Sequence, residues 1–124
     1  TETKSGKRTD YNSDAESLDI PIVILINENS ASASEVFTGA LKDYGKATVV
    51  GKKSYGKGIV QSVLPFYDGS GMSLTVAKYY TPNGTCIHGI GIEPDVEVDM
   101  PDEYKDMYAS MVEHDKDTQL QKSD

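Results

Sequence analysis

The sequence predicts an α/β fold that combines a parallel strand–helix–strand unit with a β-hairpin. Three patterns lead to the first part: an apolar run at 22–26, a helical pattern at 32–44 and a second apolar run at 47–51 follow one another. Further along, two strand-like runs flank a glycine-rich turn at 68–71. With 124 residues, the chain has the length of a single domain.

The N-terminal part, up to Asp19, is polar and predicts a peripheral hairpin followed by a loop. The turn signal is Ser5-Gly6-Lys7, between short extended segments at 2–4 and 8–11. The run at 22–26 comes next and is continuous, apolar and rich in β-branched residues. Such a run is typical of an inner strand of a parallel sheet, which is covered on both faces.

The segment from Ser32 to Tyr44 predicts an amphipathic helix. Its apolar residues recur at helical spacing, and Gly45 follows as a stop signal. Residues 47–51 predict a strand, so the order is strand, helix, strand, which favours a right-handed parallel crossover. The apolar positions of the helix are Val36, Phe37, Ala40, Leu41 and Tyr44.

The next elements are a hairpin and an edge strand. The runs 59–66 and 72–80 are joined around Asp68-Gly69-Ser70-Gly71, which is a strong hairpin signal. The short alternating segment 96–98 predicts an edge strand.

Beyond Pro101 the pattern predicts a C-terminal helix. From Asp115 onward the chain is so polar that we expect it to fray. The apolar positions that share one face of this helix are Tyr104, Met107, Tyr108, Met111 and Val112.

Composition and charge exclude several classes of protein. The formal net charge is -8, whereas surfaces for nucleic acid or anionic membranes favour clustered Lys and Arg. Cys86 is the only cysteine, so no internal disulfide can form. No apolar run approaches the roughly 18 to 20 residues that cross a bilayer. The start, Thr1 to Lys4, resembles neither a signal peptide nor a normal N-terminus, so we interpret the chain as a piece of a longer protein.

The sequence also predicts neither a metal site nor a nucleotide site. His88 and His114 have no cysteine or carboxylate at ligand spacing. Gly56-Lys57 lacks the GxxxxGK[ST] pattern of a phosphate loop, and a glycine follows the lysine. We therefore expect no metal, no cofactor and no nucleic-acid partner.

A serine-rich segment, residues 29–35, lies between the first strand and the helix, where a nucleophile can be exposed on a tight turn. The first amides of a helix have no partner within the helix and can stabilise negative charge on an attacked carbonyl oxygen. The plainer interpretation is a helix N-cap, with Ser32 and Glu35 forming a capping box. Taken alone, the segment favours the N-cap.

A serine needs a base before it can attack, and the chain offers few. His114 lies in the charged tail, and His88 lies in a glycine-rich loop, where it could be a turn residue. A lysine can act instead when burial favours its neutral amine. Lys57 stands between two glycines at the start of a strand, and Gln61 is predicted to share its strand face and to hold the amine. Taken alone, Lys57 is more typical of a strand-edge lysine after a glycine turn.

Six blocks of the sequence, spread from about Asp19 to Pro101, together resemble the carboxy-terminal processing (tail-specific) peptidases. In that family a serine and a lysine 25 positions apart form the catalytic dyad, and Ser32 and Lys57 have this spacing. The blocks are Ser30–Glu35, Ala40–Gly45, Val49–Gly51, Tyr55–Gly58 with Gln61, Tyr79–Pro82 and Gly91–Asp95.

The resemblance implies roles for four residues. Ser32 would be the nucleophile, Lys57 the general base and Gln61 the residue that orients the lysine. The amide of Ala33 would be one donor of the oxyanion hole. The implied fold is a Clp protease/crotonase-like core, and the implied substrates are unstructured C-terminal tails of proteins, cut through an acyl-enzyme outside the cytoplasm of a bacterium.

In that family a second oxyanion donor comes from an upstream Pro-Gly-Gly turn, and a PDZ domain captures substrate tails. Neither is found before Asp19. We therefore expect residues 1–124 to be the C-terminal part of a catalytic domain, weakly active or inactive in isolation. An exposed sheet edge, left without its partner strand, would favour a homo-oligomer.

Two other functions stay open at this stage. A non-catalytic peptide-binding module could use the same fold to capture extended peptides at an edge strand. A crotonase-like acyl-CoA enzyme would need two oxyanion amides and an adenine pocket, for which the sequence has no support.

Overall fold

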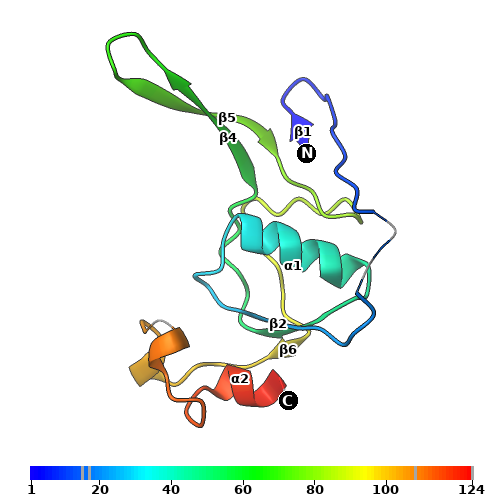
Figure 1. The fold of residues 1–124 in the computed structure, drawn as a ribbon, viewed down its shortest axis with the longest axis vertical. Helices are drawn as coiled ribbons and strands as arrows, with labels where there is room; N and C mark the ends of the chain where they lie inside the picture. The colour runs from blue at the N-terminus through cyan, green and yellow to red at the C-terminus, as the bar shows by residue number, and fades with distance from the viewer. Residues whose placement is uncertain (15, 17, 108, 124) are drawn as a thin grey trace.

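The computed structural model describes residues 1–14, 16, 18–107 and 109–123, and it consists of an α/β core with a projecting hairpin (Figure 1). The strands are β1 (Glu2–Thr3), β2 (Val23–Ile26), β3 (Thr48–Gly51), β4 (Ile59–Pro65), β5 (Gly71–Lys78) and β6 (Val96–Glu97). The helices are α1 (Ala33–Asp43) and α2 (Thr118–Ser123), with short 3-10 turns at Asp102–Tyr104 and Ala109–Met111. The predicted α/β class is confirmed.

The core sheet has the order β2-β3-β6, and both of its strand pairs are parallel. The predicted parallel strand–helix–strand unit is therefore confirmed, as is the short edge strand β6. The prediction that residues 22–26 form an inner strand is wrong for this chain. Among the strands in the described part of the chain, β2 pairs with β3 alone, so Val23 and Leu25 stay exposed, whereas Val49 and Val50 in the central strand β3 are buried.

The hydrophobic core is small and lies between the sheet and α1. Helix α1 spans the predicted residues, with Tyr44 as its C-cap and Gly45 in a left-handed conformation after it. Its inward face differs from the predicted one, because Phe37 and Tyr44 are exposed while the helix buries Glu35, Thr38 and Gly39. The buried cluster is Ile26, Val49, Ile87 and Ile92, with Ile24, Val36 and Tyr79 packed against it.

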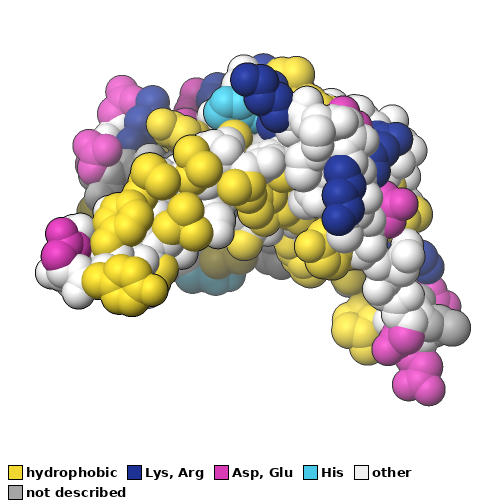
Figure 2. Space-filling model, turned by 90° about the horizontal axis from the view of Figure 1, so that it is seen from above, with side chains coloured by type: hydrophobic (Ala, Val, Ile, Leu, Met, Phe, Trp, Pro, Cys, Tyr) yellow, Lys and Arg dark blue, Asp and Glu magenta, His cyan; other side chains and the backbone are white. Residues whose placement is uncertain are grey.

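The second sheet has the order β1-β5-β4 and forms the hairpin arm that projects from the core in Figure 1. The predicted N-terminal hairpin is present, since Glu2 bridges to Arg8. In addition, β1 pairs with the base of β5 at Ala77 and Lys78, which the sequence did not predict. The face of the arm that carries Leu64, Met72 and Leu74 is exposed, and Figure 2 shows hydrophobic side chains gathered at one end of the molecule.

The C-terminal segment differs from the prediction in two ways. The single helix predicted after Pro101 is replaced by the two 3-10 turns; Tyr108, one of its predicted apolar positions, lies outside the described residues. The end does not fray but forms α2, because Asp117 Oδ1 accepts hydrogen bonds from the amides of Gln119 (3.1 Å) and Leu120 (2.9 Å). Neither helix in the described part of the chain is long and apolar enough to cross a membrane.

Candidate active site

Two segments meet at the candidate site: the serine turn, residues 27–34, and the lysine loop, residues 54–58. Ser32 is the N-cap of α1 and has φ 60° and ψ -116°. Among the described residues, it alone combines a positive φ with a side chain. Such a conformation costs about 1 to 3 kcal/mol and persists only where the surrounding contacts enforce it. A strained serine between a strand and a helix is typical of a nucleophile turn.

The serines on either side of Ser32 have structural hydrogen bonds. Ser30 Oγ accepts a hydrogen bond from the amide of Asn27 at 3.1 Å. Ser34 Oγ donates to the carbonyl oxygen of Ala31 at 2.7 Å. Both side chains thus help to shape the turn, which makes Ser32 the better candidate for a nucleophile.

The carboxylate of Glu35 joins the two segments. Its Oε2 accepts hydrogen bonds from the amides of Ser32 at 2.9 Å and Lys57 at 2.8 Å. Its Oε1 accepts from the hydroxyl of Ser54 at 2.5 Å and the amide of Gly56 at 2.6 Å. A single oxygen atom therefore holds the backbone of both predicted dyad residues, so that their amide nitrogens lie less than two hydrogen-bond lengths apart.

Burial raises the pKa of Glu35, but its four hydrogen bonds, from Ser54, Gly56, Ser32 and Lys57, together outweigh burial and lower the pKa below its ordinary value. The side chain is only 1% exposed. At neutral pH this group is thus a buried carboxylate whose charge is stabilised entirely by donors of the two segments. Hydrogen bonds to a charged acceptor are stronger than neutral ones, so the contact fixes the relative position of the segments.

The bridging role of Glu35 was missed by the sequence analysis. The capping-box contact was expected, and the hydrogen bond from the Ser32 amide confirms it. The sequence held one signal for the other contacts of Glu35, namely its helical spacing from Thr38 and Gly39. These three residues share one helix face, and that face is the buried one. A glutamate on a buried face requires several donors, which here come from the lysine loop.

The side chains of Lys57 and Gln61 are exposed, which differs from the argument made on the sequence. Burial of Lys57 was expected to favour its neutral amine, and the residues of this chain do not provide that burial. The same-face argument for Gln61 does not apply, because β4 begins at Ile59 and Lys57 lies before it in the lysine loop, where strand alternation does not relate the two side chains. The structure thus joins Ser32 and Lys57 through their backbones.

The predicted oxyanion donor, the amide of Ala33, belongs to the first residue of α1. The first amides that donate to the Ser32 carbonyl oxygen are those of Glu35 at 3.0 Å and Val36 at 3.1 Å. The amides of Ala33 and Ser34 precede these helical bonds and point out of the N-terminus of the helix. This is the position from which an amide can stabilise an oxyanion beside Ser32.

A third segment, residues 87–91, packs on the lysine loop backbone against backbone. The amide of Gly89 donates to the carbonyl oxygen of Gly56 at 2.9 Å. A Cβ atom at Gly58 would collide with the backbone nitrogen of His88, so only glycine permits this approach. The glycines beside the lysine thus serve close packing, as predicted, and they place His88 next to it.

An open cleft of about 530 Å³ lies where these three segments meet. A peptide bound in this cleft would contact Lys57 and lie beside Ala31, which precedes Ser32. The side chains around it are Ala31, Tyr55 and Ile59, which are apolar or aromatic, and Asn29, Lys57 and His88, which are polar.

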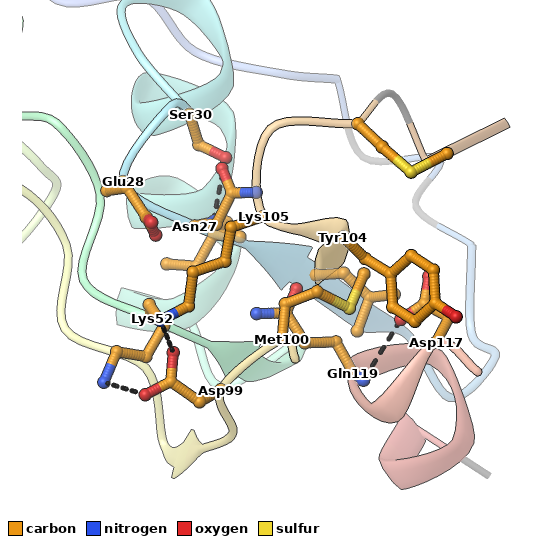
Figure 3. A pocket seen from close by; sticks show the side chains of 13 residues that line it. Asn27, Glu28, Ser30, Lys52, Asp99, Met100, Tyr104, Lys105, Asp117 and Gln119 are labelled. Atoms are coloured by element: carbon orange, nitrogen blue, oxygen red, sulfur yellow. Dashed lines mark hydrogen bonds and ion pairs between the residues drawn. The ribbon is translucent and has the colours of Figure 1, made fainter. Parts of the chain in front are cut away.

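A smaller cavity of about 140 Å³ lies between the start of the serine turn and the C-terminal segment (Figure 3). Ser30 and Glu28 face it from the turn. On the opposite wall, Lys52 Nζ lies 3.2 Å from Asp99 Oδ2. Neither Ser32 nor Lys57 lines this cavity, so it is separate from the candidate active site.

The comparisons with known proteins agree on one family. The model for peptidase family S41 matches residues 1–98. A probable CtpA-like serine protease of Staphylococcus aureus strain N315 is 56% identical over 94 residues, which is 76% of this chain and 19% of the relative. A carboxy-terminal-processing protease of Bartonella bacilliformis is 52% identical over 87 residues, 68% of this chain and 20% of the relative.

Among solved structures, the photosystem II D1 C-terminal processing protease is similar with a TM-score of 0.71 and 44% sequence identity. The match covers 78% of this chain and 26% of that protein. The chain thus spans about a fifth of the length of the curated relatives it matches.

Proposed function

Because this chain belongs to peptidase family S41, we propose that it carries the nucleophile and the base of a carboxy-terminal processing serine peptidase. The observation that carries the proposal is the Glu35 carboxylate, which binds the amides of Ser32 and Lys57 through one oxygen. A buried charge is costly, so a chain that needed only a folded core would not require this bridge. Its effect is to keep a strained serine and a lysine together.

In the proposed mechanism, Lys57 Nζ in its neutral form accepts the hydroxyl proton while Ser32 Oγ attacks the carbonyl carbon of the scissile peptide bond. The amide of Ala33 stabilises the resulting oxyanion. The lysine then gives the proton to the leaving amine, and an acyl-enzyme forms on Ser32. Water, deprotonated by the same lysine, attacks the ester and releases the second product.

The amine of Lys57 is exposed and must be shielded from water to act as a base. We propose that the bound substrate supplies part of this shielding. A peptide in the cleft would exclude water from the lysine while leaving its backbone bond to Glu35 in place. Gln61 would orient the amine in this closed arrangement.

For the whole protein, we propose substrates with unstructured C-terminal tails and a location outside the cytoplasm of a bacterium. Relatives of this chain are named for C-terminal processing, and those named above as curated relatives come from bacteria. The Clp protease/crotonase-like core is proposed on the same resemblance, together with self-association through exposed edges and faces of the sheets.

The test uses the full-length protein that contains this chain, with a serine-reactive covalent probe and an unstructured tail peptide. Ser32→Ala should abolish both labelling and cleavage while the fold is retained. Ser30→Ala and Ser34→Ala are matched controls from the same turn and should keep measurable turnover. Cleavage at the parent rate by the Ser32→Ala protein would contradict the proposal and favour a peptide-binding module.

A further inference from the structure

The candidate cleft differs in charge from the rest of the chain. The chain has a formal net charge of -8, yet no acidic side chain is found among the described residues that line the cleft. Two of its side chains, Lys57 and His88, can carry a positive charge.

Only one of these two groups can be charged when the substrate binds and the proposed reaction begins. The mechanism requires the amine of Lys57 to be neutral when it accepts the serine proton. His88 is exposed, and its imidazole can donate a hydrogen bond whether it is neutral or protonated. The remaining source of positive charge in the described cleft is therefore His88.

The backbone holds His88 in a fixed position. Its amide nitrogen packs against Gly58 at a distance that excludes any side chain there, and the next residue, Gly89, is bonded to Gly56. The isoleucine before it, Ile87, is 1% exposed and belongs to the core. Because the backbone on both sides of His88 is held in place, a contact between its side chain and a substrate in the cleft costs little backbone entropy.

We propose that His88 is a specificity-determining residue, which gives this cleft a preference for a substrate carboxylate close to the scissile bond. This inference rests on the proposed function of the site. The imidazole donates a hydrogen bond to the carboxylate and adds a charge when protonated, while Ala31, Tyr55 and Ile59 contact the apolar part of the same substrate residue. The carboxylate belongs either to an Asp or Glu side chain or to the C-terminus of the substrate.

The charged and titratable groups that face His88 are on the segments packed against it. Lys57 and Tyr55 share its cleft, and the Glu35 carboxylate lies beneath the lysine loop, where it bonds to two of its amides. Lys57 and Glu35 are the same in the parent and in the His88→Gln protein, so the change in the Asp/Asn ratio between these two proteins isolates the contribution of His88.

The experiment uses the full-length protein and pairs of peptides that carry Asp or Asn at one of the four positions flanking the scissile bond. At pH 6 the parent should cleave the Asp peptide about three- to fivefold better at one position, the size expected for a partly exposed ion pair. His88→Gln should bring this ratio of kcat/KM to about one. His88→Lys, which keeps a positive charge at this position, should restore it. His114→Gln, which changes the other histidine of the chain, should leave it unchanged.

Two further arms complete the test. Peptides that end at the preferred position with a free acid or an amide distinguish a terminal carboxylate from a side-chain carboxylate. Affinities of the same peptides for the Ser32→Ala protein make the test independent of turnover. A His88-dependent preference in binding without cleavage by the parent would retain the inference and reject the proposed function. Ratios that His88→Gln does not change at any position, in cleavage and in binding, would overturn the inference.

Discussion

The candidate active site and the hairpin arm are held in opposite ways. In the candidate active site, the side chain of Glu35 is almost fully buried and accepts its hydrogen bonds from the serine turn and the lysine loop. In the arm, β4 and β5 pair along their whole length, but the apolar side chains on one face, such as Leu74, which is 47% exposed, have little to pack against.

The chain positions its two candidate catalytic segments with its own groups, whereas it leaves one apolar face of the arm uncovered. The serine and the lysine are positioned through their backbones by a group within the chain. The arm gains its order from backbone pairing and presents an apolar face that stable isolated domains normally cover. Substitutions in the two regions should therefore act on different observables, namely turnover and folding for the first and association for the second.

The largest effect is expected for the base. Lys57→Arg keeps the positive charge but cannot deprotonate at accessible pH, so turnover in the full-length protein should fall by at least about a hundredfold, while peptide affinity changes little. Lys53→Arg is the matched control, because Lys53 is also exposed and pairs with Glu93 at 2.7 Å, away from the cleft. Steady-state kinetics of both variants check this. Substantial cleavage by the Lys57→Arg protein would show that another group takes the proton.

A smaller effect on turnover, with a loss of stability, is expected for Glu35→Gln. The amide has one carbonyl oxygen, so at least one of the four donors loses its acceptor, and the free energy of unfolding should fall by about 2 to 3 kcal/mol. Because the variant loosens the serine turn against the lysine loop, kcat should fall about tenfold or more, with a smaller change in KM. Chemical denaturation and kinetics measure the two effects.

The Asp95→Asn variant tests whether the fall in kcat of the Glu35→Gln protein comes from misplaced active-site segments or from lower stability of the fold. Asp95 accepts a hydrogen bond from the amide of Val49 at 2.8 Å and pairs with Lys42 at 2.7 Å, so its loss should also destabilise the fold. These two partners lie outside the serine turn and the lysine loop, so the kcat of the Asp95→Asn protein should stay near that of the parent at temperatures where the protein is folded. An equal fall in kcat for both variants would mean that Glu35 acts only through stability.

The same carboxylate predicts how stability depends on pH. Because the folded pKa of Glu35 is lowered, its contribution to stability is complete above the ordinary glutamate value of about 4.3 and is lost as the pH falls from there through the folded pKa. The free energy of unfolding of the parent should therefore decline in this acidic range. Denaturation midpoints measured from pH 6 down to pH 3 should decline less steeply for Glu35→Gln, and equal slopes would contradict the prediction.

The sequence predicted most elements, because local patterns such as the hairpin signal at 68–71 and the stop at Gly45 determine them. The candidate dyad came instead from the resemblance to a family, with a spacing of 25 positions between Ser32 and Lys57, and it stays a prediction. What failed depended on distant partners. The pairing of β1 with β5, the edge position of β2 and the exposure of Lys57 depend on which segments meet in space.

The C-terminal segment shows a local signal that was overlooked. The end was predicted to fray because it is polar, yet Asp117 is a strong N-cap residue and stands directly before α2. Gln119 then donates from its side chain to the carbonyl oxygen of Val98 at 3.0 Å, which fastens the helix beside the sheet. Polarity alone was thus a poor guide, since both polar side chains are buried and bonded.

Substitutions in the hairpin arm should have the smallest effect on turnover and the largest effect on self-association. Residues 59–77 contain one charged side chain, Asp68, in a chain of net charge -8, so two copies meet with the least repulsion at this surface. Leu74 lies on the apolar face with Met72, whereas its neighbour Ser73 points to the opposite face beside Val63. Leu74→Lys should therefore weaken self-association of the 124-residue chain by about tenfold or more.

Ser73→Lys makes the same change in charge on the same strand and should associate like the parent, because it leaves the apolar face intact. Sedimentation velocity over a range of concentrations measures both variants, and circular dichroism checks that the hairpin still forms. If both substitutions weaken association equally, the effect comes from charge or from the free edge of β4 rather than from the apolar face. If the parent is a monomer even at millimolar concentration, neither surface brings two copies together, and the arm would then be available to another part of the full-length protein.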